Sequence, residues 1–414
     1  VLWLETTDLC NIHCKGCYRS CVSGDRSLAE LRNEIDFAIR MRNIDTVCIA
    51  GGEPLIYPEI KPLVEFIASR GLKPNIITNA HALTTQMARD LWNAGVFGFT
   101  NHVDMMQERP ESKKGYTELD LMPLRQKICD TIYEVGKGKI YTTYNMTTYH
   151  ENFKYIPDVV KWARTNVGKV HGVEFITYRG IPITEGVEWD VEVRANETAE
   201  GIQSKLGYTE TDKTQIDINS VDCYNLLKDT LGESYEPCAY LGGTGHIREY
   251  KWWGQAGVLD RKGKVHGNVG PKTMEFVQMI HHLTQGRYFM YLKGNTAPRL
   301  AILATALLGD KKMSSTRRSI WLSLLNPLNW FKPVYFQSVG INQPPDMLED
   351  GSSSMCESCP DACVWEGNLV SSCRLEEYRK YGRLMNAIVV TQDSDKRVKV
   401  EPLPKEAVTR EDLA

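Results

Sequence analysis

The sequence predicts an α/β fold, a partial (β/α)6 TIM-like barrel over residues 1–185, followed by an α+β domain over residues 186–390. Two observations carry this prediction. Apolar strand patterns and amphipathic helix patterns alternate six times in the first 180 residues, which is typical of parallel strands with right-handed crossovers. Glycine, cysteine or polar residues follow several strands, where parallel folds hold their ligands.

Six segments have the pattern of buried strands: VLWLETT (1–7), DTVCIAG (45–51), KPNIITN (73–79), FGFTNHVD (97–104), KIYTTYNM (139–146) and VHGVEFITY (170–178). Helices are predicted between them at 27–43, 58–70, 84–94, 119–135 and 154–166, and no clear sixth helix follows. The first helix begins with a capping box of Ser27 and Glu30. Gly71 and Gly95 end the second and third helices.

The composition excludes several classes of protein. Hydrophobic residues make up 42% of the 414 residues, which is enough for a large core and argues against global disorder. A net charge of −3 argues against a nucleic-acid partner. The sequence has no run of about 18 apolar residues and no signal-peptide pattern, so we expect a cytoplasmic protein. The chain begins at Val1, which leaves open whether an N-terminal segment is missing.

Three of the twelve cysteines lie within eight residues, directly after the first strand. They are Cys10, Cys14 and Cys17. Clustered cysteines in a chain of this length indicate metal binding in a reducing compartment. Thiolates bind iron–sulfur clusters, and three of them leave one iron of a 4Fe–4S cluster without a protein ligand. An open position marks a reactive centre. The alternative is that Cys21 supplies a fourth ligand.

A glycine-rich turn follows the second strand, with the sequence Gly51-Gly52-Glu53-Pro54. The two glycines allow close approach of the backbone to a ligand. Glu53 offers a carboxylate for an ammonium group. The alternative is an ordinary strand-to-helix turn with a surface glutamate.

The CxxxCxxC loop after the first strand and the GGEP turn after the second resemble those of the radical S-adenosylmethionine (SAM) superfamily, over roughly residues 1–180. One departure is Gly16, where the family usually has an aromatic residue, with Tyr18 just after it. The resemblance implies that the open iron of a 4Fe–4S cluster chelates SAM. It also implies that an electron from an external donor such as ferredoxin or flavodoxin cleaves SAM. The 5′-deoxyadenosyl radical then takes a hydrogen atom from the substrate.

Polar residues at the ends of the third, fourth and fifth strands are further SAM contacts by the same resemblance. We select Asn79, Asp104 and Asn145 from this group, which also contains Thr78, Asn101 and His102. Each of these residues taken alone is equally consistent with a helix cap or a solvated turn, and His102 with a hydrogen-bonded core histidine.

A second cluster of cysteines lies near the end of the chain, at Cys356, Cys359, Cys363 and Cys373. Four thiolates complete a 4Fe–4S cluster, and a four-cysteine zinc site is the alternative. The pattern resembles the auxiliary-cluster domains of radical SAM enzymes, of the SPASM and twitch kinds. Cys223 and Cys238 resemble the start of a SPASM domain, but the later cysteines are one short of a second cluster. We therefore predict one auxiliary 4Fe–4S cluster, with Cys48 and Cys129 in the core.

Residues 297–337 combine apolar runs, a basic set of Lys311, Lys312, Arg317 and Arg318, and a tryptophan-rich stretch. A dozen apolar residues cannot cross a bilayer, and such runs are often buried core helices. The same composition suits an interfacial membrane segment or an apolar substrate tunnel. The segment therefore predicts either core packing or contact with lipid. A polar tail is expected at 391–414.

Three functions are consistent with these patterns. The first is a radical SAM enzyme that abstracts hydrogen from an unactivated C–H bond of a lipid or another apolar chain, with peripheral contact to a membrane. In general character it resembles lipid-modifying members such as tetraether synthases. The second is a SPASM-type maturase that modifies a peptide. The third is a non-catalytic iron–sulfur electron carrier, which has no need of a GGEP turn.

Overall fold

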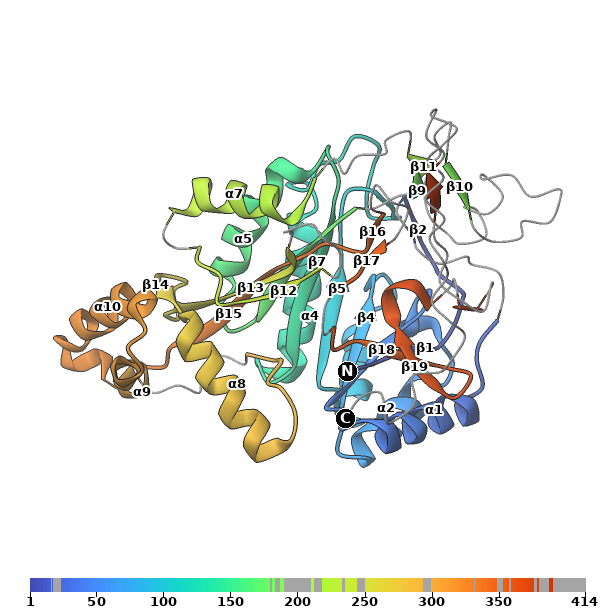
Figure 1. The fold of residues 1–414 in the computed structure, drawn as a ribbon, viewed down its shortest axis with the longest axis horizontal. Helices are drawn as coiled ribbons and strands as arrows, with labels where there is room; N and C mark the ends of the chain where they lie inside the picture. The colour runs from blue at the N-terminus through green and yellow to red at the C-terminus, as the bar shows by residue number, and fades with distance from the viewer. Residues whose placement is uncertain are drawn as a thin grey trace.

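Six parallel strands form the centre of a single sheet in the computed structural model of the chain (Figure 1). They are β1 (Leu2–Glu5), β3 (Thr46–Ala50), β4 (Lys73–Thr78), β5 (Gly98–His102), β7 (Tyr141–Thr148) and β8 (Gly172–Thr177). Each strand pairs in parallel with the next, in the order of the chain. The predicted α/β fold and its six strands are therefore confirmed, as a partial barrel.

The structure describes a defined part of the chain. The described residues are 1–15, 17, 24–178, 181–182, 187–189, 210–211, 218–232, 235–243, 250–292, 299–330, 332–347, 353–356, 359–375, 378–379 and 387–389. Gly16, Tyr18, Cys21 and the predicted polar tail at 391–414 lie outside them.

Five helices connect the strands where the sequence predicts them. They are α1 (Leu28–Met41), α2 (Ile60–Ser69), α3 (Thr85–Asn93), α4 (Met122–Gly136) and α5 (Ile156–Thr165). The capping box is present, because Ser27 accepts from the Glu30 amide and the Glu30 carboxylate accepts from the Ser27 amide. Gly71 and Gly95, just beyond α2 and α3, have the positive φ typical of a helix end.

Residues from the C-terminal half lengthen the sheet at both edges. Beyond β8 come β15 (Tyr335–Asn342), which is parallel to β8, and then β13 (Tyr250–Leu259) and β12 (Ala239–Gly242), with β14 (Val265–Asn268) also paired to β13. Beyond β1 come β18 (Ala362–Trp365) and β19 (Asn368–Ser371). β13 and β14 form an antiparallel hairpin. The predicted domain boundary at 185/186 stays a prediction.

Four short strand pairs lie outside this sheet. They are β2 (His13–Cys14) with β6 (Gln107–Glu108), β9 (Ile181–Pro182) with β11 (Glu210–Thr211), β10 (Val187–Trp189) with β20 (Ala387–Val389), and β16 (Asp346–Met347) with β17 (Ser353–Ser354). The first of these pairs holds the cysteine loop and is part of the site below.

The two faces of the strands differ in character, as β7 shows. Tyr144 points outward, because its hydroxyl donates to the Arg125 carbonyl in α4 and its ring packs edge-on against Trp162 in α5. Thr143 points inward and donates to the Thr100 hydroxyl on β5 at 2.9 Å. Side chains alternate along a strand, so Asn145 and Thr147 share the inner face with Thr143. The inner face of the partial barrel is therefore polar.

The remaining helices are α7 (Ser220–Leu231), α8 (Pro271–Gln285), α9 (Arg299–Ala304) and α10 (Ser314–Leu324). The last three project from the sheet at the left of Figure 1. A second, smaller core holds them, built around Met274, Ile302, Met313 and Ile320. Among the described residues, no helix is both long and apolar enough to cross a membrane.

Candidate active site

The cysteine loop follows the carboxyl end of β1 and is tied to the segment after β5. Cys14 lies in β2, which pairs antiparallel with β6, so that Cys14 is opposite Gln107. The Lys15 amide also donates to the Met106 carbonyl at 3.0 Å. Backbone hydrogen bonds therefore fix one side of the loop, independently of any cluster.

The Gly51–Pro54 turn fixes the other side of the loop. The Gly52 amide donates to the Thr7 carbonyl at 2.7 Å, and the Glu53 amide donates to the Leu9 carbonyl at 2.8 Å. A Cβ atom on Gly52 would lie 2.0 Å from the Leu9 carbonyl oxygen, which no backbone can accept. Gly51 also needs its positive φ of 130°. In the structure, the neighbour that these glycines approach is the cysteine loop itself.

The Glu53 side chain is fully buried and connects two strand ends through hydrogen bonds. Its carboxylate accepts from the Thr78 hydroxyl at 2.6 Å and from the amides of Asn79 and Leu55 at 2.7 and 2.9 Å. Burial raises the pKa of Glu53, and these hydrogen bonds oppose the rise. The carboxylate is thus already occupied, and contact with an ammonium group requires it to give up some of these bonds. Pro54 begins the buried turn that follows.

Asn79 connects the end of β4 to the cysteine loop. Its Nδ2 donates to Asn11 Oδ1 at 2.7 Å and lies 3.7 Å from Cys10 Sγ. Its Oδ1 accepts from the His81 amide at 2.8 Å. The predicted site residue is therefore beside the cysteines, and its amide helps to orient the first of them.

Asp104 is buried next to the same loop. Its carboxylate lies 2.8 Å from His102 Nε2 and accepts from the Met106 amide at 2.8 Å. Its charge acts on Cys14, which places it within electrostatic range of the cysteines. Through these contacts, Asp104 stabilises the 104–107 turn.

Arg109 is a residue of the site that the sequence motifs did not predict. Its side chain is buried, with Nη2 donating to the Asn79 carbonyl at 2.8 Å and Nη1 to Gln107 Oε1 at 3.0 Å. The Glu111 carboxylate lies 3.6 Å from its Nε. Arg109 acts electrostatically on Cys14, Asp104 and Glu53, so it places a positive charge beside the loop. The sequence did contain a signal for Arg109. This residue lies close to a strand end and to two acidic residues, and an arginine in such a place is a natural ion-pair partner.

Asn145 belongs to a row of inner-face residues that crosses four strands. In this row His102 is opposite Asn145, Asn145 is opposite Glu174, and Glu174 is opposite Gly340. The buried Oδ1 of Asn145 has no hydrogen-bond partner among the described residues. Gly340 leaves space that the Glu174 side chain enters, because a Cβ atom there would lie 3.3 Å from Glu174 Cγ.

Glu174 supplies the carboxyl group of this row, and its pKa is raised. Burial, together with the charge of Asp361, raises its pKa to about 7, while a hydrogen bond with Trp252 opposes the rise. The side chain is nevertheless half-buried and not fully sealed. The interior of the partial barrel thus offers an amide oxygen and a carboxyl group whose pKa is raised to about 7, so that both of its protonation states are populated near neutral pH.

Cys10, Cys14 and Cys17 lie close enough to influence each other. The Cys17 amide donates to the Cys14 carbonyl at 3.2 Å. Burial raises the pKa of Cys14, and the charges of Asp104, Cys17 and Cys10 raise it further. Across the described ranges, no three His, Cys, Asp or Glu side chains converge on a metal position as they stand. The donor set nevertheless fits a 4Fe–4S cluster, because three thiols of one anchored loop share one end of the barrel.

The four late cysteines are partly brought together. Cys356 donates a hydrogen bond to Cys359, which raises the pKa of Cys356 and lowers that of Cys359. The charge of Cys373 acts on both Cys356 and Cys363, so Cys373 lies near each of them. Four thiols linked in this way fit an auxiliary cluster by donor chemistry. The auxiliary cluster itself stays a prediction.

The other cysteines pack as apolar residues. Cys48 and Cys129 are buried in the core, as predicted. Cys223 and Cys238 are also buried, and they belong to two different hydrophobic clusters. Whether they bind a further cluster stays untested, and so does the alternative with Cys21.

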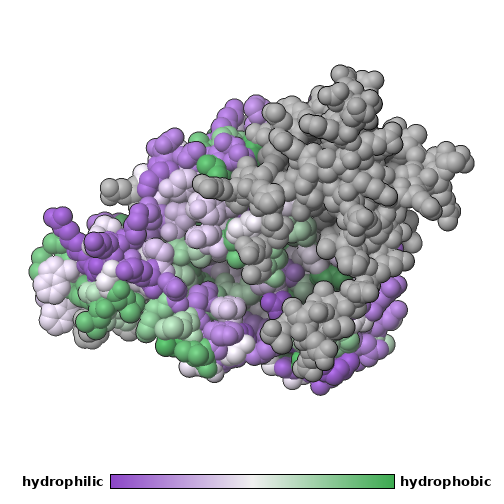
Figure 2. Space-filling model, viewed as in Figure 1, coloured by the Kyte–Doolittle hydropathy of each residue, from purple (hydrophilic) through white to green (hydrophobic). Residues whose placement is uncertain are grey.

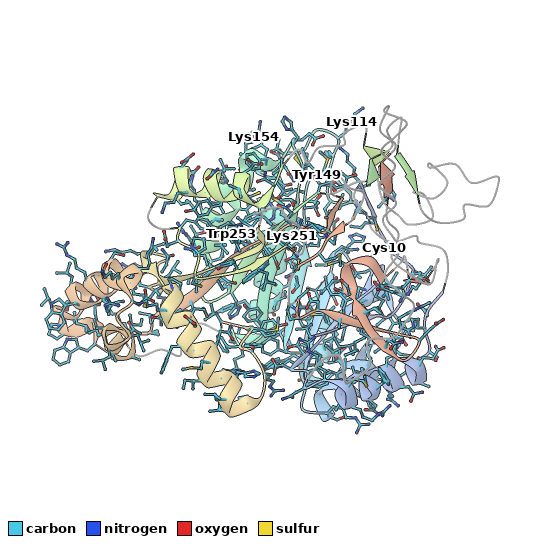
Figure 3. The ribbon with its side chains drawn as sticks, in the orientation of Figure 1. Cys10, Lys114, Tyr149, Lys154, Lys251 and Trp253 are labelled. Carbon is cyan, nitrogen blue, oxygen red and sulfur yellow. The ribbon has the colours of Figure 1, made fainter. Side chains whose placement is uncertain are left out.

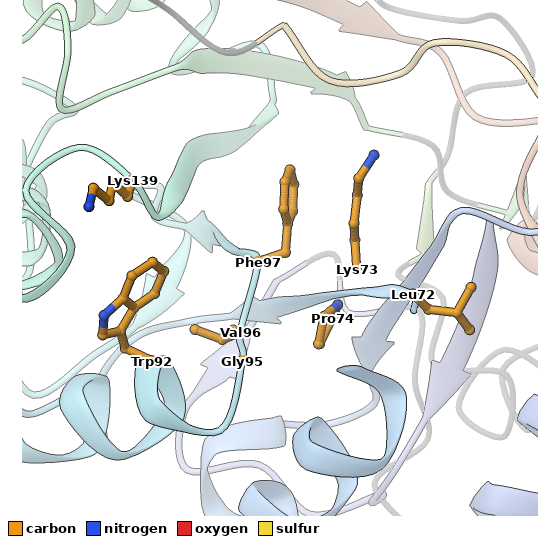
Figure 4. A pocket seen from close by; sticks show the side chains of 8 residues that line it. All are labelled: Leu72, Lys73, Pro74, Trp92, Gly95, Val96, Phe97 and Lys139. Carbon is orange, nitrogen blue, oxygen red and sulfur yellow. The ribbon is translucent and has the colours of Figure 1, made fainter. Parts of the chain in front are cut away.

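A groove of about 380 Å³ lies at the amino ends of the strands (Figure 4). Lys73 begins β4, Phe97 precedes β5 and Lys139 precedes β7, and all three line the groove. The cysteine loop follows the carboxyl end of β1, so the groove is at the opposite end of the sheet from the predicted chemistry.

Comparisons with known proteins identify the family that this part of the chain resembles. Residues 4–163 match the family model of the Radical SAM superfamily. A GTP 3′,8-cyclase of Geobacter sulfurreducens is 35% identical over 197 residues, which are 45% of this chain and 57% of the cyclase. A tungsten-containing aldehyde ferredoxin oxidoreductase cofactor-modifying protein of Pyrococcus furiosus is 23% identical over 183 residues, 39% of this chain and 47% of that protein.

The chain thus spans about half the length of the curated relatives it matches. The crystal structure of Streptococcus suis SuiB aligns with a TM-score of 0.38 and 17% identity, over 56% of this chain and 45% of SuiB. The family match covers β1 with its cysteine loop and β3 with its Gly51–Pro54 turn. Residues 4–163 of the chain are therefore similar to the radical SAM superfamily.

Proposed function

We propose that the protein is an enzyme that reductively cleaves SAM and abstracts a hydrogen atom from a C–H bond of its substrate. One observation carries the proposal. The CxxxCxxC loop is held between the Gly51–Pro54 turn and the segment after β5, at the carboxyl end of a parallel sheet. This is the end at which parallel α/β folds bind their ligands.

Each residue of the site has a role in this proposal. Cys10, Cys14 and Cys17 hold the cluster, and Asn79 and Arg109 orient the loop. A bound 4Fe–4S cluster supplies one electron, received from an external donor such as ferredoxin or flavodoxin, for cleavage of SAM to methionine. Hydrogen transfer from the substrate then gives 5′-deoxyadenosine. Asn145 and Asp104 are the proposed polar contacts to SAM at the inner face, by family resemblance.

The test is binding of SAM to the reconstituted cluster. Anaerobically reconstituted protein is reduced, and its electron paramagnetic resonance spectrum is recorded with and without SAM. The proposal expects a change in the spectrum upon addition of SAM, which the Cys10→Ala, Cys14→Ala, Cys17→Ala triple variant lacks. An unchanged wild-type spectrum, with normal iron content, would favour the electron-carrier alternative.

For the substrate, we propose an amphipathic lipid whose functional group enters the barrel. The polar inner face, with Asn145, Thr147 and Glu174, supports a polar group near the site of hydrogen abstraction. The described apolar residues of the 297–337 segment do not line that face: Trp321, Leu325 and Trp330 are exposed, on α10 and the turn after it, at the other end of the molecule from Cys10 (Figures 1 and 3). The prediction that this segment handles the reacting chain has no support from its position.

A peptide is the second candidate substrate, and the same polar inner face supports it as well. Buried peptide amides need hydrogen-bond partners, which Asn145 and Glu174 can provide. Mass spectrometry of molecules extracted from the anaerobically purified protein distinguishes the candidates. A bound lipid supports the first, and a bound peptide replaces it with the second.

We also propose that Cys356, Cys359, Cys363 and Cys373 hold an auxiliary 4Fe–4S cluster. Support comes from the Cys356–Cys359 hydrogen bond and from the place of Cys373 near both Cys356 and Cys363. Iron content and Mössbauer spectra of the Cys10, Cys14, Cys17 triple-alanine variant test this. About four irons per chain should remain in that variant, whereas zinc or no residual cluster would contradict the assignment.

A further inference from the structure

The helices α8, α9 and α10 with the described turns beside them, here called the basic arm (residues 271–292, 299–330 and 332–334), expose apolar side chains that the core does not need. On α8, Phe276, Met279, Ile280 and Leu283 follow the i, i+3, i+4, i+7 spacing of one helix face, and all are exposed, Leu283 by 73%. This is an amphipathic face turned towards solvent.

The α10 end of the arm repeats this feature with tryptophans. Trp321 and Leu325 are one helical turn apart, and Leu328 and Trp330 follow in the next turn. The two tryptophans are each 58% exposed, and Leu307, in the turn after α9, is 91% exposed. Figure 2 shows hydrophobic surface over these helices, at the lower left.

The arm is nevertheless firmly folded on its inner side. Ile320 and Met313 are buried in the second core, and the Thr316 hydroxyl donates to the Asn268 carbonyl of β14 at 2.8 Å. The Asp310 carboxylate accepts from the Thr273 amide and hydroxyl, both at 2.9 Å, which ties α10 to α8. The exposed residues are therefore the outer face of a fixed element.

The charge of this region is opposite to that of the rest of the chain. Residues 271–345 contain nine lysines and arginines and two acidic residues, a net charge of +7 in a chain of net charge −3. No aspartate or glutamate occurs from 311 to 345. Lys311, in the turn before α10, and Arg318, one helical turn before Trp321, are exposed. A net positive charge of this size in one region favours an anionic partner.

We infer that the basic arm is a docking surface for a membrane that contains anionic lipids, on which the protein lies without crossing it. Exposed tryptophan and leucine beside lysine and arginine are the composition of interfacial membrane segments. A protein partner of ordinary composition would not need two exposed tryptophans next to exposed basic residues. The inference goes beyond the proposed reaction and does not depend on it.

The position of the arm suits this role. Cys10 and α10 lie on opposite sides of the molecule in the view that Figures 1 and 3 share. Docking through the arm therefore leaves the carboxyl ends of the barrel strands accessible.

Flotation with lipid vesicles tests the inference on the full chain. Protein is mixed with phosphatidylcholine vesicles or with vesicles that also contain phosphatidylglycerol, and the bound fraction is measured at low and high salt. We expect binding to the anionic vesicles, weaker binding at high salt and little binding to phosphatidylcholine alone. No flotation with either vesicle, or equal flotation with both, overturns the inference.

Two matched pairs of variants identify the surface. Lys311→Glu with Arg318→Glu should lower vesicle affinity at least tenfold, because each basic residue at an anionic membrane contributes about 1 kcal/mol and reversal also adds repulsion. Lys114→Glu with Lys154→Glu changes the total charge equally at the upper edge of Figure 3, and should leave the affinity within about twofold of wild type, as expected of charges away from the membrane. Leu325→Ser with Leu328→Ser should also weaken binding, and Leu119→Ser, exposed elsewhere, should not.

The same experiments distinguish a membrane from other partners of the arm, including a second copy of the chain. If the arm variants bind vesicles like wild type, the surface does not contact membrane. If wild type does not float and instead dimerises in sedimentation velocity, with dimerisation lost in Leu325→Ser with Leu328→Ser, the arm is a contact between two copies and the inference is wrong. Circular dichroism and iron content of each variant confirm that the fold is intact.

Discussion

The Nδ2 atom of Asn79 lies 3.7 Å from the Sγ atom of Cys10, while the backbone amide of Asn79 donates to the buried Glu53 carboxylate at 2.7 Å. One residue at the end of β4 thus joins the cysteine loop to the Gly51–Pro54 turn. The two sequence patterns that identify the family are connected physically through this residue.

Replacement of Asn79 should therefore loosen the loop that holds the cluster. In Asn79→Ala the Asn11 and Cys10 side chains lose their shared donor, at a cost of about 1–3 kcal/mol. We expect faster loss of iron to a chelator after anaerobic reconstitution. Asn75→Ala is the control, since Asn75 lies on the same strand and donates to Thr100 away from the loop. Equal iron loss in both variants would argue against this role.

A methyl group on Gly52 should prevent the turn from reaching the loop. Because its Cβ would lie 2.0 Å from the Leu9 carbonyl oxygen, Gly52→Ala must displace backbone on one side or the other. We expect SAM cleavage to fall at least tenfold, which corresponds to about 1.4 kcal/mol. Gly115→Ala is the control, because Gly115 has a positive φ but open space at its Cβ position. Normal activity in Gly52→Ala would show that the close approach is dispensable.

Arg109 should influence both stability and the cluster. Arg109→Met leaves the Asn79 carbonyl and Gln107 Oε1 without their charged donor, and we expect a loss of about 2–5 kcal/mol in the free energy of unfolding. Removal of the positive charge near Cys14 should also make the reduction potential of the cluster more negative. Arg109→Lys keeps the charge and should lose stability with a smaller change in potential.

The potential is measured by redox titration followed by electron paramagnetic resonance, with Arg89→Met, exposed on α3, as the control. If Arg109→Met and Arg109→Lys shift the potential equally, the charge of Arg109 does not act on the cluster.

Glu174 should make stability depend on pH. Its pKa is raised from 4.5 to about 7 by burial, so the folded protein holds this proton more tightly than the unfolded chain. The resulting stabilisation is fully present below about pH 4.5 and is lost as the pH rises through about 7. The loss is at most roughly 3 kcal/mol, and water at the half-buried side chain reduces it.

Glu174→Gln lacks this titration. Its unfolding free energy relative to wild type should therefore rise between pH 5 and pH 8, as measured by denaturant unfolding under anaerobic conditions. Glu65→Gln, exposed on α2, should follow wild type. Parallel curves for Glu174→Gln and wild type would mean that Glu174 has an ordinary pKa.

Local patterns predicted the barrel well because its strands and helices are specified by nearby residues. The Ser27–Glu30 capping box and the glycines at 71 and 95 mark helix ends within a few positions. Attachment of β15 to β8 and of β18 to β1 was not predicted, since pairing over more than 150 residues leaves no local pattern.

The site was predicted in part for a similar reason. The cysteines and the Gly51–Pro54 turn are short motifs, whereas the burial of Glu53 depends on Thr78 and Asn79 from another strand. The role of Arg109 likewise depends on residues of other elements, because its partners are Asn79, just after β4, and Gln107 in β6. The exposure of Trp321 also depends on which face of α10 the second core covers, and a tryptophan-rich stretch alone leaves that open.

The most direct test of the proposed function is formation of 5′-deoxyadenosine from SAM by reduced, anaerobically reconstituted protein. We expect wild type to form 5′-deoxyadenosine with dithionite. The Cys10→Ala, Cys14→Ala, Cys17→Ala variant should form none, although it keeps any iron bound at Cys356 to Cys373. Equal formation of 5′-deoxyadenosine by both proteins, or none by wild type with a complete cluster, would contradict it.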